Sequence, residues 1–118
     1  MKKAIIFFSL AVLTSVSMFA QSSITGIWDT GDDNTMVEII QENDAPLGKI
    51  LSSDHEKAKV GTTLLKDLVK IDDVWEGKIY APKKGKWFDV EIQPAAKQLD
   101  LKISKGFISK SFIWNRVN

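Results

Sequence analysis

Short runs in which apolar and polar residues alternate recur along this chain at intervals of about ten residues. Glycine, proline, asparagine and aspartate, the residues that turns favour, cluster between the runs. An alternating run is typical of a strand with one buried face and one solvated face. The pattern therefore predicts about eight strands, which fall at residues 25–30, 35–41, 47–51, 63–71, 74–80, 87–92, 99–103 and 108–117.

Strands of this number and spacing indicate an antiparallel all-β sandwich or barrel. Closure of the sheet on itself would remove the unpaired edges that invite aggregation. We therefore predict one domain, a single antiparallel eight-stranded β-barrel. Residues 63–71 also fit a helical period, through Leu64, Leu65, Leu68 and Val69. We favour a strand, with Leu65, Val69 and Ile71 in alternation, because Asp72 and Asp73 then supply a tight turn into the next strand.

Residues 1–20 have the layout of a secretory signal peptide. A basic start, Met1-Lys2-Lys3, precedes an apolar stretch over 4–16, and the small Ala20 stands before Gln21. The stretch is interrupted by polar residues and is too short for a membrane anchor, which needs about 20 apolar residues. We predict cleavage after Ala20, a mature domain over 21–118 that is periplasmic or secreted, and no integral membrane association.

The charge of the chain is nearly balanced. Without Lys2 and Lys3, the 16 basic residues become 14 against 15 acidic ones, so the formal charge changes from +1 to −1. This balance gives no electrostatic case for nucleic acid or an anionic membrane surface as partner. The chain has no cysteine, so its stability must come from packing and from the hydrogen bonds between strands rather than from disulfides.

An ordered set of short motifs carries a family likeness. The motifs are Gly26-x-Trp28, Val37-Glu38-Ile39, Leu47-x-x-Ile50, Gly61, Leu64-Leu65, Trp75-x-Gly77-x-Ile79-Tyr80-x-Pro82-x-x-Gly85, Leu99-x-Leu101 and Trp114-x-Arg116-Val117. With this set, residues 24–117 resemble the bacterial exported proteins grouped as domain of unknown function 2147 (DUF2147). The resemblance implies a small exported lipocalin-like barrel without an established activity. The chain departs from the family pattern in lacking a cysteine pair.

The two ends of the barrel domain carry a second part of this resemblance. Lipocalin-like proteins place Gly-x-Trp at the start of the first strand and pair it with an arginine from near the end of the barrel. The matching positions are Gly26, Trp28 and Arg116, which is the only arginine of the chain. A guanidinium can lie flat on an indole and still donate to backbone carbonyls, whereas lysine cannot do both. We therefore interpret the three residues as a structural latch.

Candidate catalytic and metal-binding residues are few. His55 is the only histidine and stands in a charged loop with no nucleophile motif beside it. Catalytic sets assemble from distant residues, so spacing alone leaves an enzyme open as the third hypothesis. One histidine without cysteine offers no transition-metal site, and we predict no cofactor. The oxygen-rich residues are interpreted as polar turns or outward faces: Asp29, Asp32, Asp33, Asn34, Asp72, Asp73, Glu38, Glu76 and Glu91.

The apolar face of the predicted strands leaves two functions open, because an eight-stranded barrel is either filled by side chains or holds one small ligand. The leading hypothesis is a non-enzymatic binding protein of the cell envelope for a small apolar ligand such as an acyl chain. Its tentative ligand residues are Trp75, Ile79, Phe88, Val90, Leu99, Leu101 and Phe112. The alternative is a filled barrel that acts as an interaction or stress-response module through an outer patch of Lys83, Lys84, Lys86 and Trp87.

Overall fold

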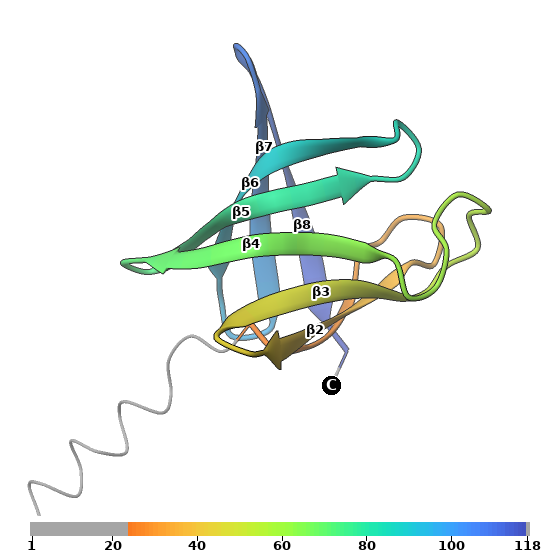
Figure 1. Cartoon of the computed structure of the whole chain (residues 1–118), viewed down its shortest axis with the longest axis horizontal. Coiled ribbons are helices and arrows are strands. Elements are labelled where there is room, and N and C mark those ends of the chain that lie inside the picture. The colour runs from red at the N-terminus through yellow and green to blue at the C-terminus, as the bar shows by residue number, and fades with distance from the viewer. Residues whose placement is uncertain (1–23, 118) are drawn as a thin grey trace, which may run out of the picture.

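Residues 24–117, which the computed structural model describes, run as extended strands joined by turns and one longer loop (Figure 1). The strands are β1 (Gly26–Asp29), β2 (Met36–Glu42), β3 (Ala45–Ser52), β4 (Thr63–Ile71), β5 (Val74–Ala81), β6 (Lys86–Pro94), β7 (Gln98–Lys105) and β8 (Ile108–Arg116). The predicted signal peptide over 1–20 lies outside the described residues.

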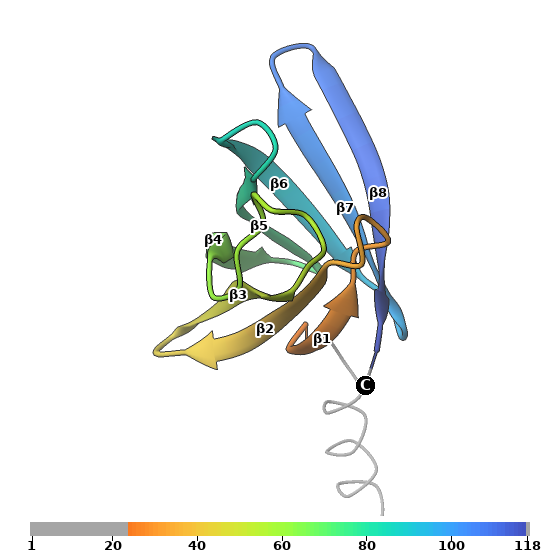
Figure 2. The same cartoon turned by 90° about the vertical axis from the view of Figure 1, so that its right-hand side faces the viewer.

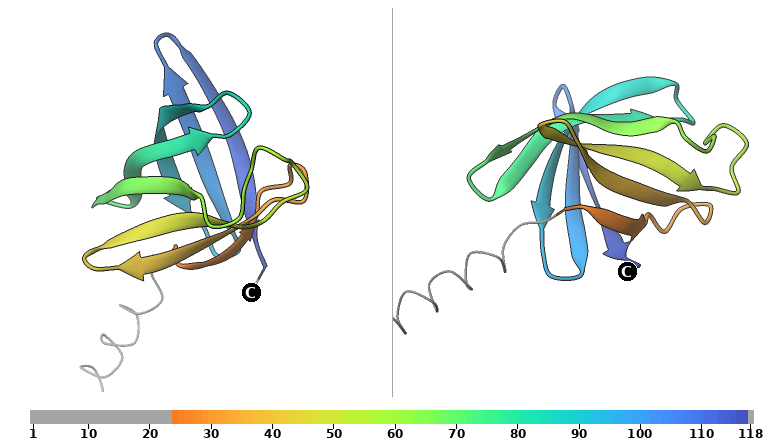
Figure 3. Two further views of the ribbon diagram at one scale, coloured as in Figure 1. Left: turned by 45° about the vertical axis from the view of Figure 1, so that its right-hand side comes forward. Right: turned by 60° about the horizontal axis from the view of Figure 1, so that its bottom comes forward.

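Each strand pairs antiparallel with the next, and β1 pairs with β8. The eight strands therefore form one closed barrel, and the prediction of an antiparallel eight-stranded barrel is confirmed. Figures 2 and 3 show the sheet curving until its first and last strands meet. Residues 63–71, for which the sequence also allowed a helix, are strand β4.

The predicted alternation is clearest in β6, where Phe88, Val90 and Ile92 are buried between exposed neighbours. Strand β4 departs from it because its register with β5 shifts between Lys66 and Val69. Within this bulge Asp67 adopts a positive φ of 55°. A bulge adds one residue to a strand and so changes which face the following side chains occupy.

The bulge corrects the predicted alternation of β4. Leu68 is buried, whereas Val69 and Ile71 are 58% and 48% exposed. Leu64 and Leu65, although adjacent in the sequence, are both buried. The apolar spacing that also fitted a helix is therefore the spacing of an interrupted strand.

The barrel closes over a short seam. Strand β1 pairs with β8 at only two positions, Trp28 with Arg116 and Asp29 with Asn115. The indole of Trp28 is fully buried, and its Nε1 donates to the carbonyl oxygen of Ile24 at 3.0 Å. The guanidinium of Arg116 lies 4.3 Å from the centre of the Trp28 ring, and its Nη1 donates to the carbonyl oxygen of Thr25 at 3.0 Å. One side chain on β8 thus holds both the ring and the backbone at the start of β1.

Replacement of the seam arginine tests its importance. We expect Arg116→Lys to lower the free energy of unfolding by about 1–2 kcal/mol, because an ammonium cannot cover the indole and also keep the donor to Thr25. Lys110→Arg, at an exposed position of the same strand, is the matched control and should stay within about 0.5 kcal/mol. Chemical denaturation measures both. An Arg116→Lys change no larger than the control would show that the seam does not depend on the guanidinium.

Gly77 is required by the bulge opposite it. A Cβ at this position would lie 2.7 Å from Leu68 Cδ2 and 2.7 Å from the carbonyl oxygen of Lys66. The carbonyl belongs to the bulged backbone and cannot move without disturbing the ladder. We expect Gly77→Ala to destabilise the protein by about 1–3 kcal/mol in thermal or chemical unfolding. Glu76→Ala, at the exposed neighbouring position, should change stability by less than about 0.5 kcal/mol. Equal stability of the two variants would contradict the close packing at Gly77.

Candidate ligand-binding cavity

Four connections meet at one end of the barrel. Because consecutive strands are antiparallel, the β1–β2, β3–β4, β5–β6 and β7–β8 connections lie at one end and the other three turns at the opposite end. We call the first of these ends the mouth. It collects residues 30–35, 53–62, 82–85 and 106–107, which are separated by up to 77 positions in the chain.

A cavity of about 1070 Å³ opens at the mouth. This volume lies just above the range of about 300–1,000 Å³ that is usual for ligand pockets. Strands β3 to β8 all contribute to its lining. The apolar residues that line it are Ile50, Ala58, Leu64, Ile79, Ala81, Pro82, Phe88, Ile103, Phe107, Ile108, Phe112 and Trp114.

The other half of the barrel is filled. Trp28, Leu65, Ile92 and Leu99 are fully buried, and none of them lines the cavity. The interior is therefore divided into a packed half at the seam and an open half at the mouth. The interior is thus packed over one part of the barrel's length and open over the other.

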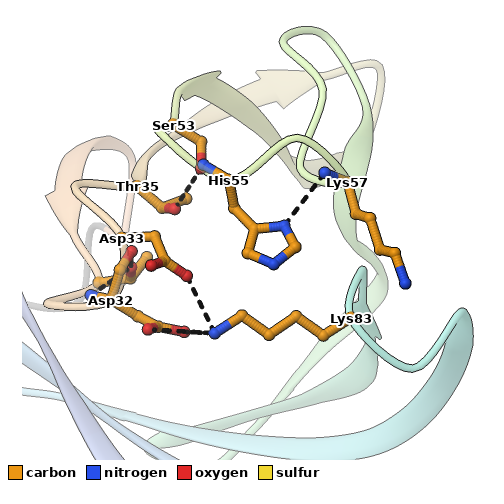
Figure 4. Close-up of polar contacts among 8 residues, drawn as sticks. Asp32, Asp33, Thr35, Ser53, His55, Lys57 and Lys83 are labelled. Atoms are coloured by element: carbon orange, nitrogen blue, oxygen red, sulfur yellow. Dashed lines mark hydrogen bonds and ion pairs between the residues drawn. The ribbon is translucent and has the colours of Figure 1, made fainter.

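An ion-pair cluster spans one side of the mouth (Figure 4). Lys83 Nζ, from the β5–β6 turn, lies 2.9 Å from Asp33 Oδ2 and 3.3 Å from Asp32 Oδ2, both from the β1–β2 turn. The hydrogen bond from Lys83 lowers the pKa of Asp33 below its ordinary value, and the charge of His55 acts in the same direction. The hydrogen bonds to Asp33 and Asp32 raise the pKa of Lys83.

Further hydrogen bonds tie the β1–β2 turn to the β3–β4 loop. Asn34 Nδ2 donates to Asp54 Oδ2 at 2.6 Å, and the hydroxyls of Thr35 and Ser53 are 2.7 Å apart. The backbone N–H of Asp54 donates to the carbonyl oxygen of Asp33 at 2.9 Å. These bonds, together with Lys83, hold three of the four connections at the mouth in one arrangement.

Two lysines at the mouth stand over an aromatic ring instead of an acid. The Nζ atoms of Lys84 and Lys105 lie 5.7 Å and 5.4 Å from the centre of the Phe88 ring. Both lysines line the cavity, and neither forms an ion pair with any of residues 24–117. The apolar cavity thus has two ammonium groups at its opening that remain available to an anion.

The tentative ligand residues divide between the two halves. Ile79, Phe88 and Phe112 line the cavity, whereas Leu99 and Leu101 are buried outside it. Val90 is buried as well and lines a second hollow, with Val69, Ile71 and Gly77, instead of the cavity. Trp75 is half-buried and packs against the core. Its indole Nε1 is buried without a hydrogen-bond partner among residues 24–117.

Of the predicted latch residues, Trp28 and Arg116 face each other across the seam, whereas Gly26 pairs with Ile39 of β2. None of the three lines the cavity.

The fold divides the predicted outer patch. Lys83 pairs with acids, and Lys84 faces Phe88. Trp87 turns to the outer surface, where its ring centre lies 5.2 Å from that of Tyr80. Lys66 Nζ, 4.2 Å from the centre of the indole, covers Trp87 further.

Several residues at the cavity carry no clear signal in the sequence. Ile50 and Leu64 line the cavity from β3 and β4, where short or interrupted alternation hid the inward face. In the sequence Asp32 and Asp33 belong to one turn and Lys83 belongs to another. Their meeting depends on barrel closure, although the rule that alternate connections of an antiparallel barrel share one end could have placed them together.

The remaining polar candidates are distributed over the mouth and the strand faces. His55 lines the mouth, where its Nδ1 accepts a hydrogen bond from the backbone N–H of Lys57 at 3.1 Å. Glu76 and Glu91 lie opposite each other on the exposed faces of β5 and β6, and Glu38 is half-buried on β2. No group of three or more metal-binding side chains comes together within residues 24–117.

Comparison with known proteins decides the family. The family described as "Uncharacterized protein conserved in bacteria (DUF2147)" matches residues 26–116. The chain belongs to this family. The match spans all eight strands and both sides of the mouth. No curated protein and no solved structure matches the chain. Nothing in residues 24–117 forms a helix with the length and apolar character of a membrane span.

The ion-pair cluster makes a prediction about pH. Because the pKa of Asp33 is lowered and that of Lys83 is raised, the pair persists between the ordinary values of 3.8 and 10.5. Its contribution is lost as the pH falls through the pKa of Asp33 or rises through that of Lys83. We expect Lys83→Ala to return the pKa of Asp33 toward 3.8, as read by NMR titration of the carboxyl carbon. Lys84→Ala, one residue away, is the control and should leave it low. Identical titration of Asp33 in both variants would contradict the pairing.

Proposed function

We propose that this DUF2147 protein is a non-enzymatic binding protein for a small amphiphile with an apolar chain and an anionic head. The observation that carries the proposal is the cavity of about 1070 Å³, whose apolar lining comes from six strands. Pockets of this kind are concave and mostly apolar, with a few polar groups that fix the orientation of the ligand. The chain of the ligand would pack against Ile79, Ile103 and Phe112.

The charges at the mouth favour an anionic head group. Lys84 and Lys105 are free of acidic partners within residues 24–117, while Lys83 is neutralised by Asp32 and Asp33. A carboxylate or phosphate at the opening would accept hydrogen bonds from the two free ammoniums. A cationic head group would meet the same two lysines and be repelled. A fatty acid is the simplest ligand with the required chemistry.

The polar contacts at the mouth support binding rather than catalysis. The hydroxyl of Ser53 is shared with Thr35 and with the backbone N–H of His55. The imidazole Nδ1 of His55 accepts from the backbone of Lys57. A nucleophile activated by histidine needs a direct hydrogen bond between the two side chains. Among residues 24–117 the imidazole of His55 bonds instead to a backbone group, the N–H of Lys57.

The interaction-module alternative has weaker support. Trp87 is 38% exposed, and the ring of Tyr80 and the ammonium of Lys66 already pack against it. This arrangement leaves a small aromatic surface, whereas the cavity offers a large apolar one. Export to the periplasm or beyond belongs to the same proposal, and rests on the signal-peptide layout of residues 1–20.

Binding of a fluorescent fatty acid tests the proposal. We expect saturable binding of dansyl-labelled undecanoic acid, with competition by decanoic acid. Ile103→Trp, which places an indole in the cavity, should weaken binding at least about tenfold, because loss of two buried methylenes at about 0.8 kcal/mol each already has this effect. Ile113→Trp is the matched control on β8, since Ile113 is 50% exposed and does not line the cavity.

Trp87→Ala should also bind the probe as the wild type does. Absence of saturable binding, or an equal loss in Ile113→Trp and Ile103→Trp, would refute the proposed site. Loss of binding in Trp87→Ala alone would move the interaction to the outer surface.

A further inference from the structure

The turn between β7 and β8 carries two uncovered apolar side chains. Phe107 is fully exposed and Ile108 is 75% exposed. We call residues 105–110 the hairpin tip; it comprises Lys105, Gly106, Phe107, Ile108, Ser109 and Lys110. Large exposed apolar side chains that stand side by side mark a contact surface more often than single ones do.

The hairpin tip projects from the barrel. Figure 2 shows the β7–β8 hairpin reaching beyond the other connections at the mouth. The cause lies in the seam, because the short β1 pairs with β8 only at Asn115 and Arg116. The rest of β8 has β7 as its one ladder partner among the described strands. No hydrogen bond or ion pair within residues 24–117 joins residues 105–108 to the other three connections.

Positive charge gathers at the same place. Lys105 and Lys110 flank the two apolar side chains, Lys102 lies on the same hairpin, and residues 101–118 contain no aspartate or glutamate. The whole chain is nearly neutral, so this excess of lysine in one segment is balanced by acidic residues elsewhere in the chain. An apolar tip flanked by lysines is complementary to an anionic lipid surface. Apolar side chains enter the interfacial region, while ammonium groups stay with the lipid phosphates.

We propose that the hairpin tip docks the protein on an anionic lipid bilayer. Phe107 and Ile108 enter the interfacial region, and Lys105 and Lys110 contact lipid phosphates. The same four residues line the cavity, so docking sets the mouth against the bilayer. An amphiphile then passes between membrane and cavity with little exposure of its chain to water. This last consequence rests on the proposed function, whereas the docking does not.

Because the chain has no cysteine, a single introduced cysteine can carry a fluorescent label at one chosen position. Ser109→Cys, exposed within the hairpin tip, accepts a single environment-sensitive fluorophore and leaves Phe107 and Ile108 in place. Asp73→Cys, exposed in the β4–β5 turn at the opposite end, is the matched control. Both are made in the full chain, so that residues 1–20 contribute equally. Vesicles of phosphatidylglycerol mixed with phosphatidylcholine are compared with vesicles of pure phosphatidylcholine.

We expect the label at position 109 to shift to shorter wavelength, and to be shielded from an aqueous quencher, with the mixed vesicles. The label at position 73 should not respond. Phe107→Ser with Ile108→Ser should weaken vesicle binding at least about tenfold, as loss of one buried large apolar side chain already has this effect. Val69→Ser with Ile71→Ser, a matched exposed pair on β4, should leave binding unchanged.

Lys105→Gln with Lys110→Gln should weaken binding to the mixed vesicles at least about tenfold, because each lysine near an anionic surface contributes about fivefold. An equal response at positions 73 and 109, no response at either, or a response that survives Phe107→Ser with Ile108→Ser would overturn the docking proposal. So would a shift at position 109 that grows with protein concentration without vesicles, since a second copy would then cover the tip.

The docking test and the cavity test fail separately. The fatty-acid titration is done in vesicle-free buffer and depends on Ile103, which lies outside the hairpin tip. Vesicle docking without probe binding would leave the hairpin tip as a membrane contact and refute the cavity function. Probe binding without docking would refute only the inference about the tip.

Discussion

The contact of Arg116 with Trp28 is the constraint on which the rest of the barrel depends. Strand β1 is only four residues long and meets β8 at two positions. Few ladder hydrogen bonds are available there, so a side chain must add to the closure. The guanidinium covers a fully buried indole at 4.3 Å and also donates to the backbone ahead of β1. Without that closure, β1 and β8 would present unpaired edges.

The short seam also determines where the open half of the barrel lies. Trp28 and its neighbours fill the interior beside the seam. Beyond Asp29 the chain leaves the sheet, and β8 continues toward the mouth with β7 alone. The cavity and the projecting hairpin tip therefore arise from the same feature, a first strand that is shorter than the last. Packing is concentrated beside the seam, and the cavity lies toward the mouth, where β1 no longer pairs with β8.

Much of this architecture could be predicted from the sequence, because alternation and turn residues report on local structure. The strand alternation at Phe88, Val90 and Ile92 predicted β6 and its inward face correctly. The division of the interior into a packed half and an open half could not be predicted. Leu99 and Phe112 both lie in runs of alternating apolar residues, and they differ in their position along the barrel axis. The position of a residue along the barrel axis depends on the register between strands. A bulge such as the one at Asp67 changes that register without a clear sequence signal.

The ion-pair cluster at the mouth also could not be predicted from local sequence patterns. Asp33 and Lys83 each fit an ordinary polar turn when considered alone, and only closure brings them within 2.9 Å. The charge balance of the whole chain likewise concealed the lysines that gather around Phe107. Local patterns therefore predicted the fold, whereas the candidate site depends on contacts between distant segments.

The most direct measurement of the central claim is a map of isoleucine δ1-methyl NMR shifts during titration with decanoic acid. The account predicts perturbation of Ile50, Ile79 and Ile103, which line the cavity. The methyl groups of Ile39 and Ile92 in the filled half, and of Ile113 on the outer face, should stay unchanged. Saturating shifts at Ile113 with none at Ile79 and Ile103, or no shifts at any isoleucine, would contradict it.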